Sequence, residues 1–187
     1  MDKQSNELPN EQSVKTEELK KVTFMLDVIK RYDHYIGTIN VKAGLLFSFI
    51  VVVIWNVTKY TAEITASGCL TKFLFVLAFV VILSGILSTY YLLSSIFPNL
   101  SSSSYKRSLI FYGDVSKKYA DKKEYIKEVN AASVDDVLDD LAGQAYDISN
   151  ILLEKFSRQK QAVNWLKFVM LPSFFTYVFT MLWIGSV

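Results

Sequence analysis

Three long stretches of this chain carry no charged residue, and they constrain its fold more than any other feature. They are Ala43–Thr58, Phe73–Tyr105 and Phe168–Val187, with 16, 33 and 20 residues. All 38 Asp, Glu, Lys and Arg residues lie in the other 118 positions. A soluble domain spreads its charge, because each of its elements has a face in water. This segregation therefore predicts a membrane protein.

Each stretch has a length that suits a transmembrane helix. A bilayer core of about 30 Å requires about 20 apolar residues in a helix. Phe73–Phe97 and Phe168–Val187 meet this requirement, although Pro172 can kink the second of them. Ala43–Thr58 is shorter, but its flanking lysines can snorkel and extend it; a buried core helix is the alternative for this run. The sequence predicts an all-α integral membrane protein with three transmembrane helices.

The basic residues predict the orientation of these spans. The first 42 residues hold seven Lys and Arg, residues 106–167 hold eleven, and the connection 59–72 holds two. The positive-inside rule places the first two segments in the cytoplasm, and residues 59–72 and the C-terminus on the other side. The predicted segments are a disordered tail at 1–15, a cytoplasmic helix at 16–42, a first span at 43–58, an extracytoplasmic loop at 59–72, a second span at 73–97, a cytoplasmic helical hairpin at 98–167 and a third span at 168–187.

The cytoplasmic segments are predicted to form a helical stalk. Apolar residues between Leu19 and Ile36 follow helical spacing, and a second helix is expected from about Tyr105 to Val129. After a turn at Asn130–Ser133, Ser133 can cap a third helix, with Asp136 completing an imperfect capping box. Nothing obvious stops that helix before the third span.

Two blocks of opposite charge favour a hairpin in this stalk. Lys106–Lys127 carries seven basic and three acidic residues, whereas Ser133–Glu154 carries six acidic residues and no basic one. Two antiparallel helices joined at residues 130–133 would lay these blocks side by side. The stalk is therefore expected to be held partly by charge pairing.

The sequence contains no pattern typical of an enzyme. Phosphate-binding glycine motifs, Cys/His metal spacing and nucleophile elbows are absent from it, so we expect no catalysis, no metal and no bound cofactor. The single His34 can be a pH-sensitive contact or an ordinary interfacial group. The cluster Asp135, Asp136, Asp139 and Asp140 can bind a cation or act in acid–base chemistry, but a solvated or salt-bridged helix face is the simpler interpretation.

A basic and aromatic cluster is the candidate site for an anionic ligand. Lysines 117, 118, 122, 123 and 127 are interleaved with tyrosines 112, 119 and 125. Lysine can neutralise a phosphate and tyrosine can stack on a base; pairing with the acidic helix is the alternative, and a nucleic acid polymer is not expected. The candidate ligand-binding residues are Tyr112, Lys117, Lys118, Tyr119, Lys122, Lys155 and Arg158.

Small residues in the second span are candidates for close helix packing in the membrane. Ser84, Gly85 and Ser88 allow backbones to approach one another. Three helices cannot readily enclose an aqueous pore, so we expect a homo-oligomer.

Several landmarks resemble a known family. They are YIGTINVKAGLLFSF at the first span, SLIFYGDVSKKY after the second, and DVLDDLAGQAYDISNILLEKFSRQKQAVNWL before the third. Their order resembles that of the transmembrane effectors of bacterial Pycsar antiphage systems, over roughly residues 20–187. The aromatic-Gly element matches at Phe111-Tyr112-Gly113 and the Lys-aromatic element at Lys155-Phe156, whereas Asn40 stands where the family pattern has Asp.

The resemblance implies a function that the residues alone do not show. In that family an adjacent pyrimidine cyclase makes cyclic CMP or cyclic UMP on infection, and the effector then impairs the bacterial inner membrane and kills the infected cell. The implied partners are the lipid bilayer, the cyclic nucleotide and further copies of the chain. The alternative function is a non-enzymatic accessory or scaffold subunit that tethers a partner to the membrane through its stalk.

Overall fold

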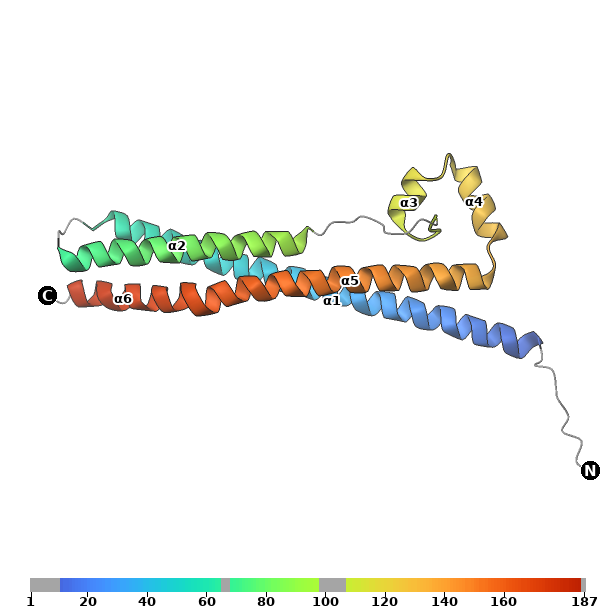
Figure 1. Ribbon diagram of the computed structural model, residues 1–187, viewed down its shortest axis with the longest axis horizontal. Coiled ribbons are helices and arrows are strands. Elements are labelled where there is room, and N and C mark those ends of the chain that lie inside the picture. Colours follow the sequence, from blue (N-terminus) through green and yellow to red (C-terminus); the bar gives the residue numbers. More distant parts are fainter. Residues whose placement is uncertain (1–10, 65–67, 98–106, 186–187) are drawn as a thin grey trace, which may run out of the picture. The chain divides into compact units, whose positions relative to one another are not determined.

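The computed structural model describes residues 11–64, 68–97 and 107–185, and every regular element within these ranges is a helix (Figure 1). Three helical stretches are long and apolar enough to cross a membrane, which confirms the predicted fold class. The elements are α1 (Glu11–Ala62), α2 (Cys69–Ile96), α3 (Tyr112–Lys117), α4 (Lys122–Ala131), α5 (Val134–Trp165), the π-helix η1 (Leu166–Met170) and α6 (Leu171–Gly185).

The first helix is longer than the sequence pattern predicted. It begins at Glu11, so residues 11–15 are helical although they were assigned to a disordered tail; residues 1–10 of that tail lie outside the described residues. It ends at Ala62 and α2 begins at Cys69, so the connection is shorter than the predicted 59–72. The hydroxyl of Thr61 donates to the Val57 carbonyl at 2.6 Å, which satisfies this polar side chain inside the last turn.

The chain divides into two compact units, and α1 and α5 contribute to both. We call residues 1–35 and 100–151 the polar unit, and residues 36–99 and 152–187 the span unit. The span unit contains nearly all of the uncharged sequence. The polar unit contains α3, α4 and most of the charged residues.

The span unit is a three-helix bundle with an apolar core. Gly85 of α2 faces α1 so closely that a Cβ atom at this position would lie 2.7 Å from Cδ1 of Ile54. Glycine is therefore required for this approach, as in other membrane helix pairs. The buried apolar side chains of the core are Ala43, Ile50, Val53, Val57, Leu74, Ala78, Val81, Leu92, Ala162, Leu166, Met170 and Tyr177.

Polar contacts fix the register of the three helices at both ends of the bundle. At one end, Lys155 of α5 donates to the Ser95 carbonyl of α2 at 2.6 Å. The next contact lies seven residues further along α5 and seven residues back along α2. There Ser88 Oγ donates to the Ala162 carbonyl at 2.9 Å. At the other end, Thr61 and Tyr177 join α1 to α6 at 2.9 Å. Helices α2 and α5 therefore run antiparallel in a constant register.

The third span contains a π-helical turn where a kink at Pro172 was considered. Proline has no N–H to donate, and its ring crowds the carbonyl four residues earlier. In η1 the chain widens by one residue, and the N–H of Leu171 donates to the carbonyl of Leu166. Helices α5, η1 and α6 thereby form one continuous helical stretch, as the absence of a stop signal predicted.

The predicted single helix from Tyr105 to Val129 is wrong over its described part. Residues 107–111 are not helical, and two short helices, α3 and α4, follow with a break between them. The break has a local cause, because the Asp121 side chain accepts from the N–H of Glu124 at 2.7 Å and caps a new helix. The carboxylate of Glu124 in turn accepts from the N–H of Ala120 at 2.6 Å. This reciprocal capping starts α4 afresh.

The predicted start of α5 is confirmed. The N–H of Asp136 donates to Ser133 Oγ at 3.1 Å, and the Asp136 carboxylate accepts from the N–H of Ser133 at 3.1 Å. This is a capping box with Asp in place of the usual Glu. It separates α4 from α5 with only two residues between them.

Candidate functional site

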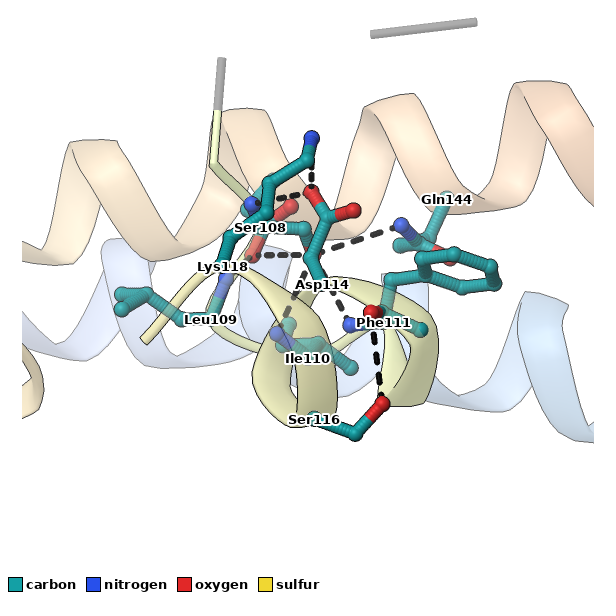
Figure 2. Close-up of polar contacts among 10 residues, drawn as sticks. Ser108, Leu109, Ile110, Phe111, Asp114, Ser116, Lys118 and Gln144 are labelled. Carbon is teal, nitrogen blue, oxygen red and sulfur yellow. Dashed lines mark hydrogen bonds and ion pairs between the residues drawn. The ribbon is translucent and has the colours of Figure 1, made fainter. Parts of the chain in front are cut away.

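A loop at residues 107–111 is the most tightly organised feature of the polar unit, and Ser108 is at its centre (Figure 2). Ser108 is only 4% exposed. Its hydroxyl donates to Asp140 Oδ2 of α5 at 3.0 Å and accepts from the N–H groups of Ile110 and Phe111 at 3.1 and 2.8 Å. The Gln144 amide also donates to this hydroxyl at 3.3 Å. One small side chain therefore holds the loop against the first turns of α5.

The loop is fastened to α3 through Asp114, which is 3% exposed. Its carboxylate accepts from the N–H of Ser108 at 3.0 Å and from Lys118 Nζ at 2.8 Å (Figure 2). Gly113 precedes it because the Phe111 ring folds over that position; a Cβ atom on Gly113 would lie 2.5 Å from the ring. The aromatic-Gly element found in the sequence is thus a packing requirement of this loop.

Asp140 completes the attachment. Besides Ser108, its Oδ2 accepts from the N–H of Leu109 at 2.7 Å. Asp140 belongs to the acidic cluster that was expected to be a solvated or salt-bridged face. The structure instead uses it to bind backbone and hydroxyl donors, which is a common role for a half-buried carboxylate.

Arg107 links the loop to α4. Its guanidinium donates to Glu124 at 2.9 Å and to Glu128 at 3.4 Å, and it lies 5.6 Å from the centre of the Tyr119 ring. The hydrogen bond with Glu124 raises the pKa of Arg107 further above its usual value. The pKa of Glu124 is lowered, first by the N–H of Ala120 and then by Arg107. Arg107 is therefore a permanent cation held between two carboxylates.

Tyr119 is buried beneath this cation. Its side chain packs edge-on against Tyr125, with ring centres 5.2 Å apart. Its hydroxyl is buried and has no hydrogen-bond partner of good geometry among the described residues, although the Glu128 carboxylate lies near it. Burial, and then the nearby Glu128 carboxylate, raise the pKa of Tyr119, so the phenol stays neutral. An unpartnered buried hydroxyl costs stability unless another group satisfies it.

A cavity of about 500 Å³ opens beside the loop, between α4 and the first half of α5. This volume is within the usual range for small-molecule sites. Among the described residues, Arg107 is the only cation that lines it, whereas five carboxylates do so. The cavity thus offers one strong anion-binding group and many hydrogen-bond acceptors. Its lining residues are Arg107, Ser108, Leu109, Glu128, Ala131, Ala132, Asp136, Asp139, Asp140, Gly143, Gln144, Tyr146 and Asp147.

The structure does not gather the predicted ligand-binding residues into this cavity. Tyr112 and Lys117 are exposed on α3, and Lys122 is exposed at the start of α4. Lys118 pairs with Asp114, and Tyr119 is buried behind Arg107. The ion pairs described for the basic block lie within residues 107–128. Its pairing with the acidic block stays a prediction.

Lys155 and Arg158 belong to the span unit. Arg158 is half-buried and pairs with Glu154 one turn earlier on α5. Lys155 is 3% exposed and donates to the carbonyls of Ser95 and Ile96, at 2.6 and 3.0 Å. It thus caps the C-terminus of α2, where free carbonyls favour a cation.

Asn40 also contacts this lysine. Lys155 Nζ lies 3.4 Å from Asn40 Oδ1. Asn40 therefore lies opposite a buried cation. Its amide oxygen accepts a hydrogen bond from this cation without forming an ion pair.

The small residues of the second span are buried within the chain. Gly85 faces Ile50 and Ile54 of α1, and Ser88 donates to the Ala162 carbonyl of α5. Ser84 is 2% exposed and donates to the Val81 carbonyl of its own helix at 3.0 Å. This patch therefore packs helices of the same chain together.

Sequence reasoning missed Ser108, Asp114, Gln144 and Arg107 as a connected group. One available signal was the spacing of Asp121 and Glu124, which marks a helix start and so breaks the basic segment into pieces. The contacts from residues 108 and 109 to residue 140 cross more than thirty positions. A contact between residues so far apart leaves no pattern in the sequence around either of them.

Comparison with known proteins gives one family. Residues 24–183 match the Pycsar effector protein domain, PycTM. The chain is also 31% identical over 156 residues to the Pycsar effector protein EcPycTM of Escherichia coli, covering 79% of this chain and 84% of that protein. No solved structure matches it.

Proposed function

This chain belongs to the Pycsar effector protein family, and we propose that it is a membrane-embedded effector of bacterial antiphage defence that a cyclic pyrimidine mononucleotide activates. The proposal has three parts: the polar unit binds cyclic CMP or cyclic UMP, the span unit lies in the inner membrane, and binding leads to loss of membrane integrity. The chain itself carries out no catalysis, and an adjacent pyrimidine cyclase supplies the nucleotide. The N-terminus and the polar unit are cytoplasmic and the C-terminus extracytoplasmic, following the basic-residue counts.

The cavity beside Arg107 is the observation that carries the binding proposal. A cyclic mononucleotide presents one negative phosphodiester, a sugar hydroxyl and a base. Arg107 matches the first of these, because a guanidinium binds phosphate oxygens in a fork. The carboxylates of the cavity accept hydrogen bonds, so they match the hydroxyl and the amino group of a cytosine base. A uracil base has no amino group, so we expect cyclic CMP to bind more tightly.

Phosphate binding requires a change in the partners of Arg107. In the structure its guanidinium is shared by Glu124 and Glu128. A phosphate that takes one face of the guanidinium competes with those carboxylates and loosens the link between the loop and α4.

The continuous helix from Val134 to Gly185 gives a route from ligand to membrane. The cavity is lined by its first half, and η1 and α6 belong to the span unit. A ligand shifts a two-state equilibrium only by its difference in affinity for the two states, and moving the ratio from 1:99 to 99:1 requires about 5.5 kcal/mol. Several subunits that change together can share this requirement.

Binding to the purified, detergent-solubilised chain tests the proposal. Calorimetry with cyclic CMP, cyclic UMP and cyclic AMP is expected to give binding of the pyrimidine nucleotides, with loss of at least tenfold in affinity in Arg107→Gln. Lys30→Gln is the matched control, because Lys30 is an exposed cation that pairs with Asp27 on α1. Binding of none of the three nucleotides would favour the accessory-subunit function. Equal binding by Arg107→Gln would place the site elsewhere, with the exposed lysines of α3 and α4 next in order.

A further inference from the structure

Lys167 lies on the exposed surface of the span unit, level with the middle of the uncharged stretches of α1 and α2. The polar contacts between the helices give this level. Lys155 contacts Ser95, and Ala162 contacts Ser88. Each residue further along α5 is therefore level with one residue earlier in α2. Five residues beyond Ala162, Lys167 is therefore level with Leu83 of α2.

The first span gives the same depth. Asn40 is level with Lys155, and Thr61 is level with Tyr177. Lys167 is then level with about Val52, which lies inside the uncharged stretch Ala43–Thr58. The centres of Ala43–Thr58 and Phe73–Phe97 thus lie at the same level. At a rise of about 1.5 Å per residue, Lys167 lies roughly 9–14 Å from the borders of the first stretch and roughly 15–21 Å from those of the second.

A bilayer placed to fit only the uncharged stretch Phe168–Val187 would still enclose charged side chains. If the hydrocarbon began at Phe168, it would reach past the end of α1 and enclose Lys59, Glu63 and Lys72. It would also leave the apolar half of α2 after Leu83 in water. An arrangement with two lysines at membrane depth, Lys160 closer to the border and Lys167 closer to the middle, is the better of the two, so the third membrane helix begins well before the uncharged stretch at 168.

Lys167 is not alone on its face. Ser157, Lys160, Asn164 and Lys167 follow one another at intervals of three, four and three residues, and all four are exposed. This spacing keeps them on one side of a helix. The buried side of the same stretch consists of Lys155, Gln159, Ala162, Leu166 and Met170. The polar stripe is therefore on the exposed side of the helix, although Lys160 also borders a groove that Lys42 and Leu45 of α1 line.

Lipid cannot satisfy this stripe. A lysine stem reaches only about 6 Å, so an ammonium group at this depth cannot snorkel to either surface. Ionisable groups within membranes face protein or a water-filled cavity. The Lys167 ammonium lies 5.1 Å from the centre of the Phe168 ring and makes no ion pair with another described residue. An outward-facing polar stripe requires a polar partner.

We propose that the stripe Ser157, Lys160, Asn164 and Lys167 faces further copies of this chain and that together they line an aqueous path through the membrane. No Asp or Glu occurs in residues 36–62, 69–97 or 155–187. A second copy thus brings lysine but no carboxylate to this depth, so water solvates the ammonium group and a mobile anion balances its charge. Rings of lysine favour anions in pores. The π-helical turn η1 contains Lys167, and such turns often mark functional positions.

The interface part of this proposal rests on the position of the bilayer alone, whereas conduction also rests on the proposed function. Disulfide cross-linking in native membranes tests the interface without a nucleotide. In a Cys69→Ser background, Asn164→Cys is expected to form oxidised dimers. Ile86→Cys is the matched control, because Ile86 is level with Asn164 in this register and is exposed on α2. Stronger dimers from Ile86→Cys than from Asn164→Cys would overturn the proposed interface.

Ion flux tests the path itself. In proteoliposomes with added cyclic CMP or cyclic UMP, chloride permeability is expected to exceed potassium permeability several-fold, and Lys167→Glu is expected to reverse that preference. Lys42→Glu, a charge reversal at the edge of the first span, is expected to keep it. An unchanged preference in Lys167→Glu would refute the path even if the cross-link forms. Cross-linking through Asn164 together with no response to any nucleotide would retain the interface and refute the proposed function.

Discussion

Replacing Lys155 with methionine should destabilise the span unit substantially, although it alters no apolar contact. Lys155 is 3% exposed and gives two hydrogen bonds of ordinary length to the last carbonyls of α2. Hydrogen bonds to a charged group contribute about 1.5–3 kcal/mol each, and a cation at a helix C-terminus contributes up to about 2 kcal/mol. Methionine fills a similar volume but donates nothing. Since these contributions overlap, we expect a loss of roughly 2–4 kcal/mol in the free energy of unfolding.

The measurement is reversible unfolding in mixed detergent micelles, followed by tryptophan fluorescence. Lys42→Met is the control, because Lys42 is an exposed lysine at the same end of the bundle. Asn40→Asp supplies the second half of a double-mutant cycle, since it places a carboxylate where the Asn40 oxygen lies 3.4 Å from the ammonium. Asn40→Asp should stabilise the wild-type chain and destabilise the Lys155→Met chain further. A Lys155→Met loss no larger than that of Lys42→Met would refute the helix-capping role.

Four further outcomes follow from the same contacts. Gly85→Ala should cost about 1–3 kcal/mol by crowding Ile54, and Gly85→Ala combined with Ile54→Val should recover part of it in the same unfolding assay. Ser108→Ala should lower the melting temperature and weaken nucleotide binding together, because its hydroxyl holds the loop to α5. Tyr119→Phe should be neutral or stabilising by roughly 1 kcal/mol without ligand. Because the pKa of Tyr119 is raised, the wild type should lose stability as the pH rises above about 10, and the variant should lose less. The pKa of Glu124 is lowered, so the stability it contributes is present above about pH 4.3 and is lost as the pH falls further; melting curves of Glu124→Gln should lack that acid-dependent step.

The sequence predicted the three membrane helices because charge segregation is a property of composition. Ala43–Thr58 and Phe73–Phe97 lie inside the observed α1 and α2. The third span was harder to locate, since its buried Lys155 and exposed Lys167 look like ordinary charged positions until the register against α2 is known. A buried lysine that caps another helix leaves no periodic signal.

The polar unit was predicted less well, for a different reason. The capping residues Asp121 and Glu124 break the helix that apolar spacing favoured, and local capping prevailed over that weak pattern. The lysines of α3 and α4 were chosen as anion ligands by residue type, whereas the cavity is lined by Arg107 and by carboxylates of α5. When a fold brings side chains together from distant parts of the chain, the local sequence around each of them does not reveal the site.

Nucleotide-triggered leakage from liposomes tests the central claim most directly. The purified chain is reconstituted with an enclosed dye, and cyclic CMP, cyclic UMP or cyclic AMP is added to the side that the polar unit faces. We expect little leakage without nucleotide, rapid leakage with a cyclic pyrimidine nucleotide, and none with cyclic AMP. Arg107→Gln should abolish the response, while Lys30→Gln preserves it. Leakage that is equally fast with no nucleotide, or no leakage with any of the three, would contradict the claim that this chain is a nucleotide-activated membrane effector.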